Sequence, residues 1–179
     1  LGSPVPSAGA YQSARIRFLF PAALVLNGPP KPGDWVVDLE DNRFRVLTVD
    51  GQARDGSGYT TWVCECLNLV LAYDLSSTGV VIEEPRLRLD AAGVGVREWR
   101  TRFSGFRCKV VKLLDETAEE RAIRGFKGSF AVYLEDELAV TDQMRVVWAG
   151  ALTGYLEILK YHPAAALDQL PVIDAEAVP

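Results

Sequence analysis

The clearest pattern in the sequence is the alternation of apolar and polar residues between Leu138 and His162. Two apolar runs, Met144–Trp148 and Tyr155–Tyr161, stand on either side of a short connection that contains Gly150 and Gly154. Strands place successive side chains on opposite faces, and glycines allow the chain to turn sharply between them. The pattern therefore predicts a β-hairpin over this stretch.

Similar alternation predicts strands along most of the chain. Short segments rich in β-branched and aromatic residues are separated by groups of Gly, Pro, Asp and Asn, which favour turns. A polar, glycine-rich loop is predicted between Asp50 and Gly58, and Pro85 suggests the edge of a sheet. The predicted strands are Ala14–Leu26, Asp34–Leu39, Arg43–Val49, Tyr59–Leu71, Val80–Glu84, Arg86–Leu89, Val96–Phe103, Phe106–Leu114, Ser129–Glu135 and Leu170–Val178.

One segment has the pattern of a helix. Between Asp115 and Gly125, Thr117 is followed three residues later by Glu120, the spacing of a capping box. Acidic residues come first, basic residues come last, and Gly125 follows as a stop, which matches the helix dipole. A single short helix is predicted here.

These elements together predict a mainly β protein with one or two small antiparallel β-barrels, SH3-like or OB-like, or a sandwich. Two segments with similar hairpin patterns favour two barrels. The predicted organisation is a flexible arm over residues 1–10, an N-terminal β domain over 11–105 and a C-terminal barrel over 106–179. The glycine and proline content of the arm is typical of a segment that is free or that orders on a neighbouring subunit.

Composition narrows the classes of function. The 179 residues are 49% hydrophobic and 24% charged, which suffices for a buried core. The net charge of −5 disfavours a free-standing nucleic-acid binder, because such proteins usually carry a basic stripe. The longest apolar run, Phe18–Leu26, is too short to span a bilayer, so no membrane association is expected.

Metal and thiol chemistry are not expected. Cys64 and Cys66 alternate on one predicted strand, and the odd total of three cysteines with Cys108 does not suggest a disulfide framework. Core packing is the favoured interpretation, since free cysteine behaves as a small apolar residue. His162 is the sole histidine and is predicted to be structural or solvated.

Acid–base catalysis also lacks a coherent set of residues. Each acidic group lies at a predicted turn or helix start, where carboxylates are common for structural reasons. We therefore predict no catalytic residue, no metal and no cofactor, and no enzymatic activity. The acidic groups considered are Asp38 with Glu40 and Asp41, Asp115 with Glu116, Glu119 and Glu120, and Glu135 with Asp136 and Glu137.

A basic segment with aromatic residues between its cations allows two interpretations. It could be a contact face for nucleic acid or for another subunit. It could equally be the solvated face of two adjacent strands, and this second interpretation is favoured. The residues of this candidate basic face are Arg97, Arg100, Arg102 and Arg107.

The segment from Gly128 to Glu176 resembles the head–tail joining family of tailed bacteriophages, which includes head-completion or stopper proteins. Four stretches carry the resemblance, and within them Asp142, Gly154, Tyr155 and Ile158 stand near the positions that the family favours. The stretches are Ser129–Asp136, Val140–Gly150, Gly154–Tyr161 and Leu170–Glu176. The first hundred or so residues have no counterpart in many members.

The resemblance implies a homo-oligomeric ring in the virion neck that joins the capsid and portal to the tail and helps to close the DNA channel. It implies other neck proteins as partners, namely a portal or adaptor and a tail terminator or tail tube, with genomic DNA passing through the ring. It supplies no catalytic residue. Loops suit such assembly, and the candidate contacts are Asp50, Arg54, Asp55, Gly58, Ala151, Leu152 and Thr153.

Two alternatives stay open. The chain could be another tail protein, such as a tail terminator or a baseplate protein. It could also be a β-barrel module that binds nucleic acid or carbohydrate through the candidate basic face.

Overall fold

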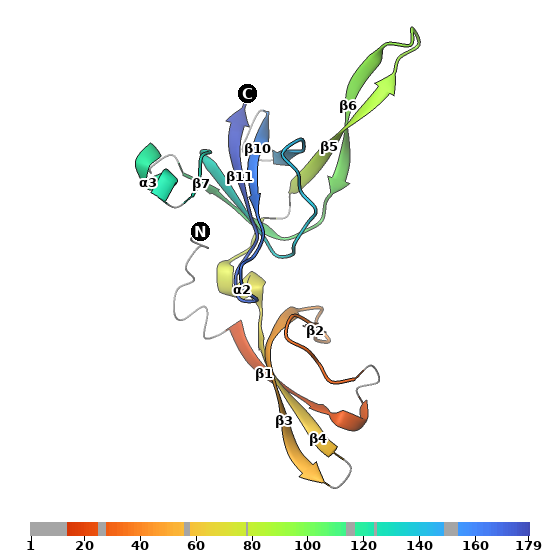
Figure 1. Ribbon diagram of the computed structural model, residues 1–179, viewed down its shortest axis with the longest axis vertical. Helices are drawn as coiled ribbons and strands as arrows, with labels where there is room; N and C mark the ends of the chain where they lie inside the picture. The colour runs from red at the N-terminus through yellow and green to blue at the C-terminus, as the bar shows by residue number, and fades with distance from the viewer. Residues whose placement is uncertain are drawn as a thin grey trace. The chain divides into compact units, whose positions relative to one another are not determined.

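A computed structural model describes residues 14–24, 28–55, 58–77, 79–113, 117–123, 125–148 and 154–179 of the chain. These residues form a mainly β structure of eleven strands in two antiparallel sheets (Figure 1), so the predicted fold class is confirmed. The arm predicted over residues 1–10 lies outside the described residues. No helix formed by the described residues is long and apolar enough to cross a membrane.

Sheet A is a curled half-barrel with the strand order β1-β4-β3-β2. Its inner face buries Phe44, Val46, Cys64 and Cys66, which form the core of this part of the chain. The four strands are β1 (Arg15–Pro21), β2 (Trp35–Val37), β3 (Arg43–Asp55) and β4 (Gly58–Leu67), with a 3-10 turn η1 (Ala22–Leu24) after β1.

The loop predicted over Asp50–Gly58 is wrong. Strand β3 continues to Asp55 and β4 begins at Gly58, and Asp50 pairs with Val63 in the ladder between them. Strand pairing depends on the backbone, so a polar, glycine-containing stretch can extend a hairpin whose apolar part lies further from the turn.

Helix α2 (Leu69–Tyr73) replaces the end of the strand predicted over Tyr59–Leu71. The Asn68 side chain accepts a hydrogen bond from the Leu71 amide at 3.0 Å and caps the helix. Asp74 adopts a left-handed conformation, with φ of 55°, and ends it. This local capping overrides the β character of the apolar residues around it.

Sheet B has the strand order β6-β5-β9-β10-β11-β8-β7. Strands β9 and β10 pair antiparallel, with Leu156 opposite Val146, which confirms the hairpin predicted between Leu138 and His162. The strands are β5 (Val80–Leu89), β6 (Gly95–Phe103), β7 (Cys108–Lys112), β8 (Phe130–Leu134), β9 (Arg145–Trp148), β10 (Tyr155–His162) and β11 (Val172–Val178).

Helix α3 (Ala118–Ile123) confirms the predicted helix and its capping box. The Glu120 amide donates to the Thr117 hydroxyl at 3.2 Å, and the Glu120 carboxylate accepts from the Thr117 amide at 2.8 Å. These reciprocal bonds satisfy donors that the first turn would leave unpaired. The pKa of Glu120 is lowered, first by the hydrogen bond from the Thr117 amide.

The described chain divides into two compact units at Asp74 and Leu75. One unit contains sheet A, α2 and the short segment Ala165–Gln169, and the other contains sheet B and α3. The domain boundary predicted at residues 105 and 106 differs from this division. The reason is that β5 and β6 precede that position, whereas β9, to which β5 pairs, follows it.

Candidate functional site

Strand β5 changes its apolar face halfway along its length. Val80 and Ile82 are buried in the core of sheet B, at even positions. After Glu83 the apolar residues occur at odd positions, as in Leu87 and Leu89. Because side chains alternate between the faces of a strand, the second half presents its apolar residues on the face opposite the core.

Strand β6 pairs with this second half of β5, so its side chains share the same two faces. On one face of the β5–β6 pair Pro85 lies opposite Trp99, Leu87 opposite Arg97 and Leu89 opposite Gly95. The other face carries the charged residues Glu84, Arg86, Arg88, Glu98 and Arg100, together with Val96. We call the segments 84–89 and 95–100 the ribbon, and Pro85, Leu87, Leu89 and Trp99 its apolar face.

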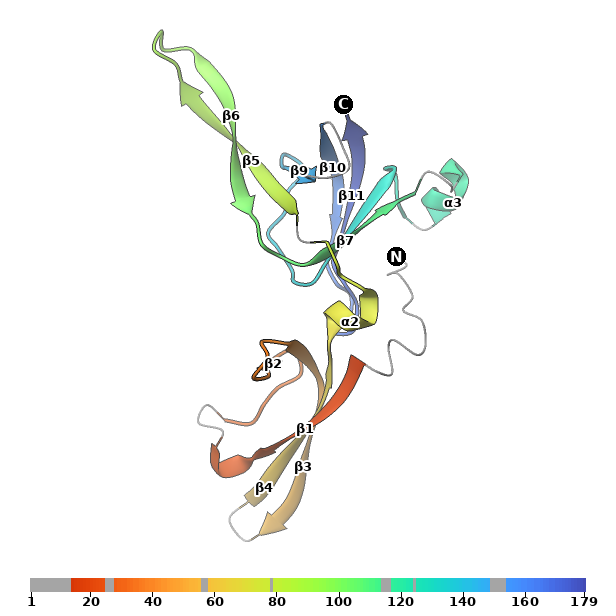
Figure 2. The ribbon, with the colours of Figure 1, turned by 180° about the vertical axis from the view of Figure 1, so that it is seen from behind.

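Among the described residues, no third strand pairs with the ribbon. Strand β9 pairs with β5 only from Val80 to Glu83, and the ribbon extends past the other strands of sheet B (Figures 1 and 2). Leu87 is 76% exposed and Leu89 is 66% exposed. Pro85 lies beyond the point where β9 stops, so its missing N–H costs no bond to that strand, which fits the edge position predicted for it.

A cluster around Arg145 of β9 fixes the base of the ribbon. The Arg145 Nε donates to the Glu83 carboxylate at 2.7 Å, and both side chains are about one-fifth exposed, at 22% and 20%. The guanidinium lies 4.2 Å from the centre of the Trp99 ring and 4.9 Å from that of Tyr155. The cation–π contact with Trp99 thus attaches the ribbon to β9, and the bond to Glu83 and the contact with Tyr155 hold Arg145 in place beside it.

The candidate basic face does not form one surface on the ribbon. Arg97 lies on the apolar face, whereas Arg100 lies on the opposite, charged face. Arg102 lies 3.7 Å from Glu84, an ion pair between exposed groups. Arg107 is exposed and lies just before β7. The carboxylates between these arginines lower the positive charge that a phosphate backbone would meet.

The candidate assembly contacts are distributed over two places. Asp50 is exposed on β3, and Arg54 and Asp55 end that strand where Gly58 begins β4. The remaining candidates, Ala151, Leu152 and Thr153, lie outside the described residues.

An acidic turn follows the edge strand β2. The Asp38 carboxylate accepts hydrogen bonds from the Glu40 amide at 2.8 Å and from the Asn42 amide at 2.9 Å. The Asn42 side-chain amide donates to it as well, and this bond is the largest cause of the lowered pKa of Asp38. The turn is thereby held in one shape, with the Leu39 side chain fully exposed at its tip.

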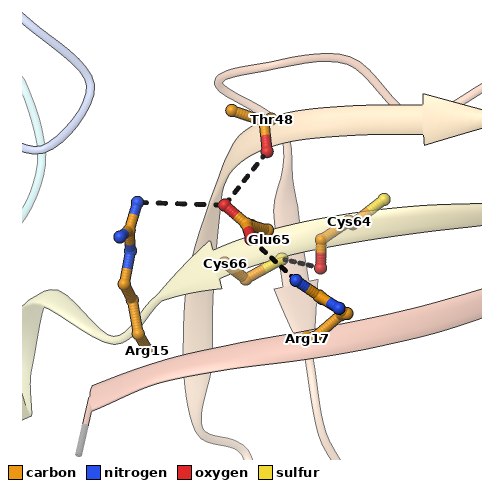
Figure 3. A network of polar contacts seen from close by, with 6 residues as sticks. All are labelled: Arg15, Arg17, Thr48, Cys64, Glu65 and Cys66. Carbon is orange, nitrogen blue, oxygen red and sulfur yellow. Dashed lines mark hydrogen bonds and ion pairs between the residues drawn. The ribbon is translucent and has the colours of Figure 1, made fainter. Parts of the chain in front are cut away.

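A second polar network lies on the outer face of sheet A (Figure 3). Glu65 of β4 accepts a hydrogen bond from Arg17 of β1 at 3.0 Å, lies 3.9 Å from Arg15, and accepts from Thr48 of β3 at 3.4 Å. The pKa of Glu65 is lowered, chiefly by the Arg17 bond. The three charged side chains are open to solvent, so the network is a cross-strand ion cluster rather than an enclosed site.

The cysteines pack in the cores, which confirms their structural interpretation. Cys64, Cys66 and Cys108 are fully buried. Burial raises the pKa of Cys66 to about 12 and that of Cys108 to about 12, so neither is a thiolate at neutral pH. No group of three or more potential metal ligands occurs among the described residues.

His162 is buried at the end of β10, with its ring edge-on to Phe126 at 6.1 Å between centroids. Its pKa is lowered, first by burial and then by Lys160, while Asp174 acts in the opposite direction. The prediction that it is a structural residue fits this burial, whereas solvation does not.

A buried carboxylate on β11 was missed from the sequence. Asp174 is fully buried and accepts hydrogen bonds from the amides of Lys127 at 2.7 Å and Gly128 at 2.8 Å. Glu176 accepts from both the amide and the hydroxyl of Ser129, at 2.8 and 2.7 Å. Acidic residues at alternate positions in an otherwise apolar final strand are the signal that could have indicated this role.

Comparison with known proteins does not name a family: no model of a protein family matches the chain, and no curated protein matches it. Among the described residues, the arrangement best suited to recognition is the ribbon, with its exposed apolar face and fixed base. An exposed apolar face of this kind is typical of surfaces that contact another macromolecule.

Proposed function

We propose that the chain is a structural subunit of the tailed-phage neck, where it forms a ring that joins the capsid and portal to the tail and helps to close the DNA channel. Its partners are further copies of itself and the neighbouring neck proteins, a portal or adaptor and a tail terminator or tail tube, and its location is the virion. The proposal assigns it no catalytic activity, no cofactor and no membrane.

The observation that carries the proposal is the exposed apolar face of the ribbon. Apolar side chains that project on a strand pair, away from the core of their own sheet, are expected where another protein covers them. The Arg145 cluster holds the ribbon's base, so the contact surface is presented in one orientation. Structural subunits need such surfaces more than they need pockets.

The resemblance to the head–tail joining family adds support. The four stretches that carry it contribute β8, β9, β10 and β11, which are neighbours in sheet B in the order β9-β10-β11-β8. The ribbon continues from the same sheet through β5. The proposed contact surface is therefore attached to the part of the chain that resembles the head–tail joining family.

The direct test is the composition of purified phage particles from the source of the sequence. We expect mass spectrometry to detect the chain in intact particles and in isolated tails or necks, and electron microscopy to locate it in a ring between head and tail. Absence of the chain from particles that are otherwise complete contradicts the proposal.

The second candidate is a module that binds nucleic acid or carbohydrate, favoured by three exposed arginines on one projecting strand. A two-stranded ribbon can enter a nucleic-acid groove. Binding to DNA that weakens steeply with salt, and that is lost when Arg97, Arg100 and Arg102 are changed to serine, would favour this candidate over a neck subunit.

A further inference from the structure

We propose that the apolar face of the ribbon in one copy of the chain binds the acidic turn Asp38–Asp41 of a second copy. This inference rests on the proposed function, since it identifies the contact that would link neighbouring copies in the ring. The two surfaces lie on different parts of the chain, so the contact is heterologous and can repeat around a closed ring.

The ribbon needs a partner to be stable. A two-stranded hairpin without a third strand is marginal in water, and here the leucines of its apolar face are mostly exposed. Six residues per strand span about 20 Å, so the face measures only on the order of 200 Å². This is well below the roughly 800 Å² per partner of a stable pair. A contact of this size is weak between two isolated copies, and repeated contacts in a ring reinforce one another.

Charge favours a second copy as the occupant. From Glu84 to Arg102 the ribbon region contains five arginines and three carboxylates, giving it a charge of +2. The whole chain has a charge of −5, so the remainder carries −7. On the apolar face itself the charged residue is Arg97, so an acidic surface of another copy is complementary there, whereas a second ribbon would present a like charge.

The acidic turn matches the ribbon in both apolar and charged groups. Leu39 is fully exposed and Val37 is 55% exposed, and Asp38, Glu40 and Asp41 provide three carboxylates around them. The hydrogen bonds to Asp38 fix the turn before binding, which reduces the entropy cost of association. Arg97 lies on the apolar face of the ribbon, where it can reach a carboxylate beside a docked leucine.

The exposed residue Leu19 matches the ribbon less well. Leu19 is exposed on β1 next to Arg17 and close to Arg15, so its surroundings are basic like the ribbon. Like charges facing one another oppose binding of the ribbon there.

Crosslinking between two different variants tests the contact directly. Leu87→Cys protein is mixed with Leu39→Cys protein of distinguishable mass under mild oxidation, since the three native cysteines are buried. We expect the mixed disulfide to exceed either self-linked product severalfold. Leu71→Cys, an exposed leucine in α2, replaces Leu39→Cys as the matched control and should give little mixed product.

Charge exchange gives an independent measurement of the same contact. Arg97→Glu and Glu40→Arg should each weaken self-association about tenfold in sedimentation equilibrium, and the double variant should recover most of that loss. Circular dichroism and thermal unfolding confirm that each variant folds. A protein that stays monomeric at every concentration tested, a dominant self-linked product of the Leu87→Cys variant, or charge variants that are not restored in the double variant each overturn the inference.

The failure of this inference is distinguishable from the failure of the proposed function. A chain that is found in the virion neck, but whose association is unaffected by the ribbon variants, contradicts only the ribbon contact. A chain that crosslinks through ribbon and turn but is absent from particles contradicts only the neck assignment.

Discussion

Gly128 lies directly against the backbone of Ala175, so closely that a Cβ on Gly128 would be 2.1 Å from the Ala175 carbonyl oxygen. Gly128, two residues before β8, can therefore approach β11 only because it has no side chain. The same approach brings the Gly128 amide within 2.8 Å of the Asp174 carboxylate. One missing side chain thus allows the hydrogen bonds that attach this loop to the last strand of sheet B.

Gly128→Ala is expected to lower the free energy of unfolding by at least about 2 kcal/mol, because a backbone oxygen cannot move aside as a flexible side chain can. Chemical denaturation followed by tryptophan fluorescence measures the change. Gly95→Ala is the matched control, since its Cβ would meet the Leu87 side chain at an ordinary 3.5 Å. Equal stability losses in the two variants would contradict the argument.

Asp174→Ala is expected to cost about 2–4 kcal/mol, because two amides would lose a fully buried acceptor, and at the buried amide of Gly128 water cannot replace it. Asp90 provides the control. It also accepts hydrogen bonds from two amides, those of Ala92 and Val94, but it is exposed at the turn between β5 and β6. Water can satisfy those amides, so Asp90→Ala should cost less than about 1 kcal/mol. Denaturation midpoints of the two variants, compared at equal m-values, test the difference.

The strand pattern could be predicted from the sequence because alternation follows directly from strand geometry. It located the β9–β10 hairpin, and the spacing of Thr117 and Glu120 located α3. The extension of β3 to Asp55 could not be predicted in this way, since its polar residues carry no apolar alternation and the ladder uses backbone groups alone. Helix α2 is set by its two caps, Asn68 at the start and Asp74 at the end, rather than by an apolar pattern.

The candidate site was only partly predictable. The arginines of β6 were identified from the sequence, but the change of apolar face at Glu83 was not. The signal for it is present in Val80–Leu89, where the apolar positions shift from even to odd numbers after Glu83. Which strands pair with β5, and where β9 stops, depends on contacts distant in sequence. Only those contacts show that Leu87 and Leu89 lack cover from a third strand.

His162 should make the stability of the protein depend on pH below neutrality. Burial holds its pKa below the ordinary value near 6.5, so the unfolded chain binds a proton at a higher pH than the folded one. The free energy of unfolding should therefore fall as pH drops below about 6.5, until the folded histidine is also protonated. Since this is the sole histidine, His162→Leu should remove that slope between about pH 7 and 5.5. An unchanged slope in the variant would assign the effect to other groups.

The three cysteines should resist alkylation in the folded protein at about pH 8. All are fully buried, and the raised pKa values of Cys66 and Cys108 leave them protonated. Intact mass after iodoacetamide treatment should show no adduct under native conditions and three adducts in denaturant. Rapid labelling of one thiol in the native state would indicate local opening of its core and would require a cysteine-free background for the crosslinking variants.

Arg145→Met should loosen the ribbon more than the rest of sheet B. The substitution keeps an apolar chain over Trp99 but leaves the largely buried Glu83 carboxylate without its partner, at a cost of about 1–3 kcal/mol. Hydrogen exchange followed by mass spectrometry should then become faster in peptides that cover β5 and β6. Peptides that cover β8 and β11 should stay protected, because those strands lie on the other side of β10.

Glu83→Gln in the Arg145→Met background provides the control for this result, because a neutral amide removes the unpaired charge. The double variant should recover part of the lost protection, and a double-mutant cycle gives the coupling between the two side chains. Uniform loss of protection across the sheet would instead show that Arg145 supports the whole core. If the loss is confined to the ribbon, the same variant should also weaken association between copies, since a ribbon without a fixed base must be ordered when it binds.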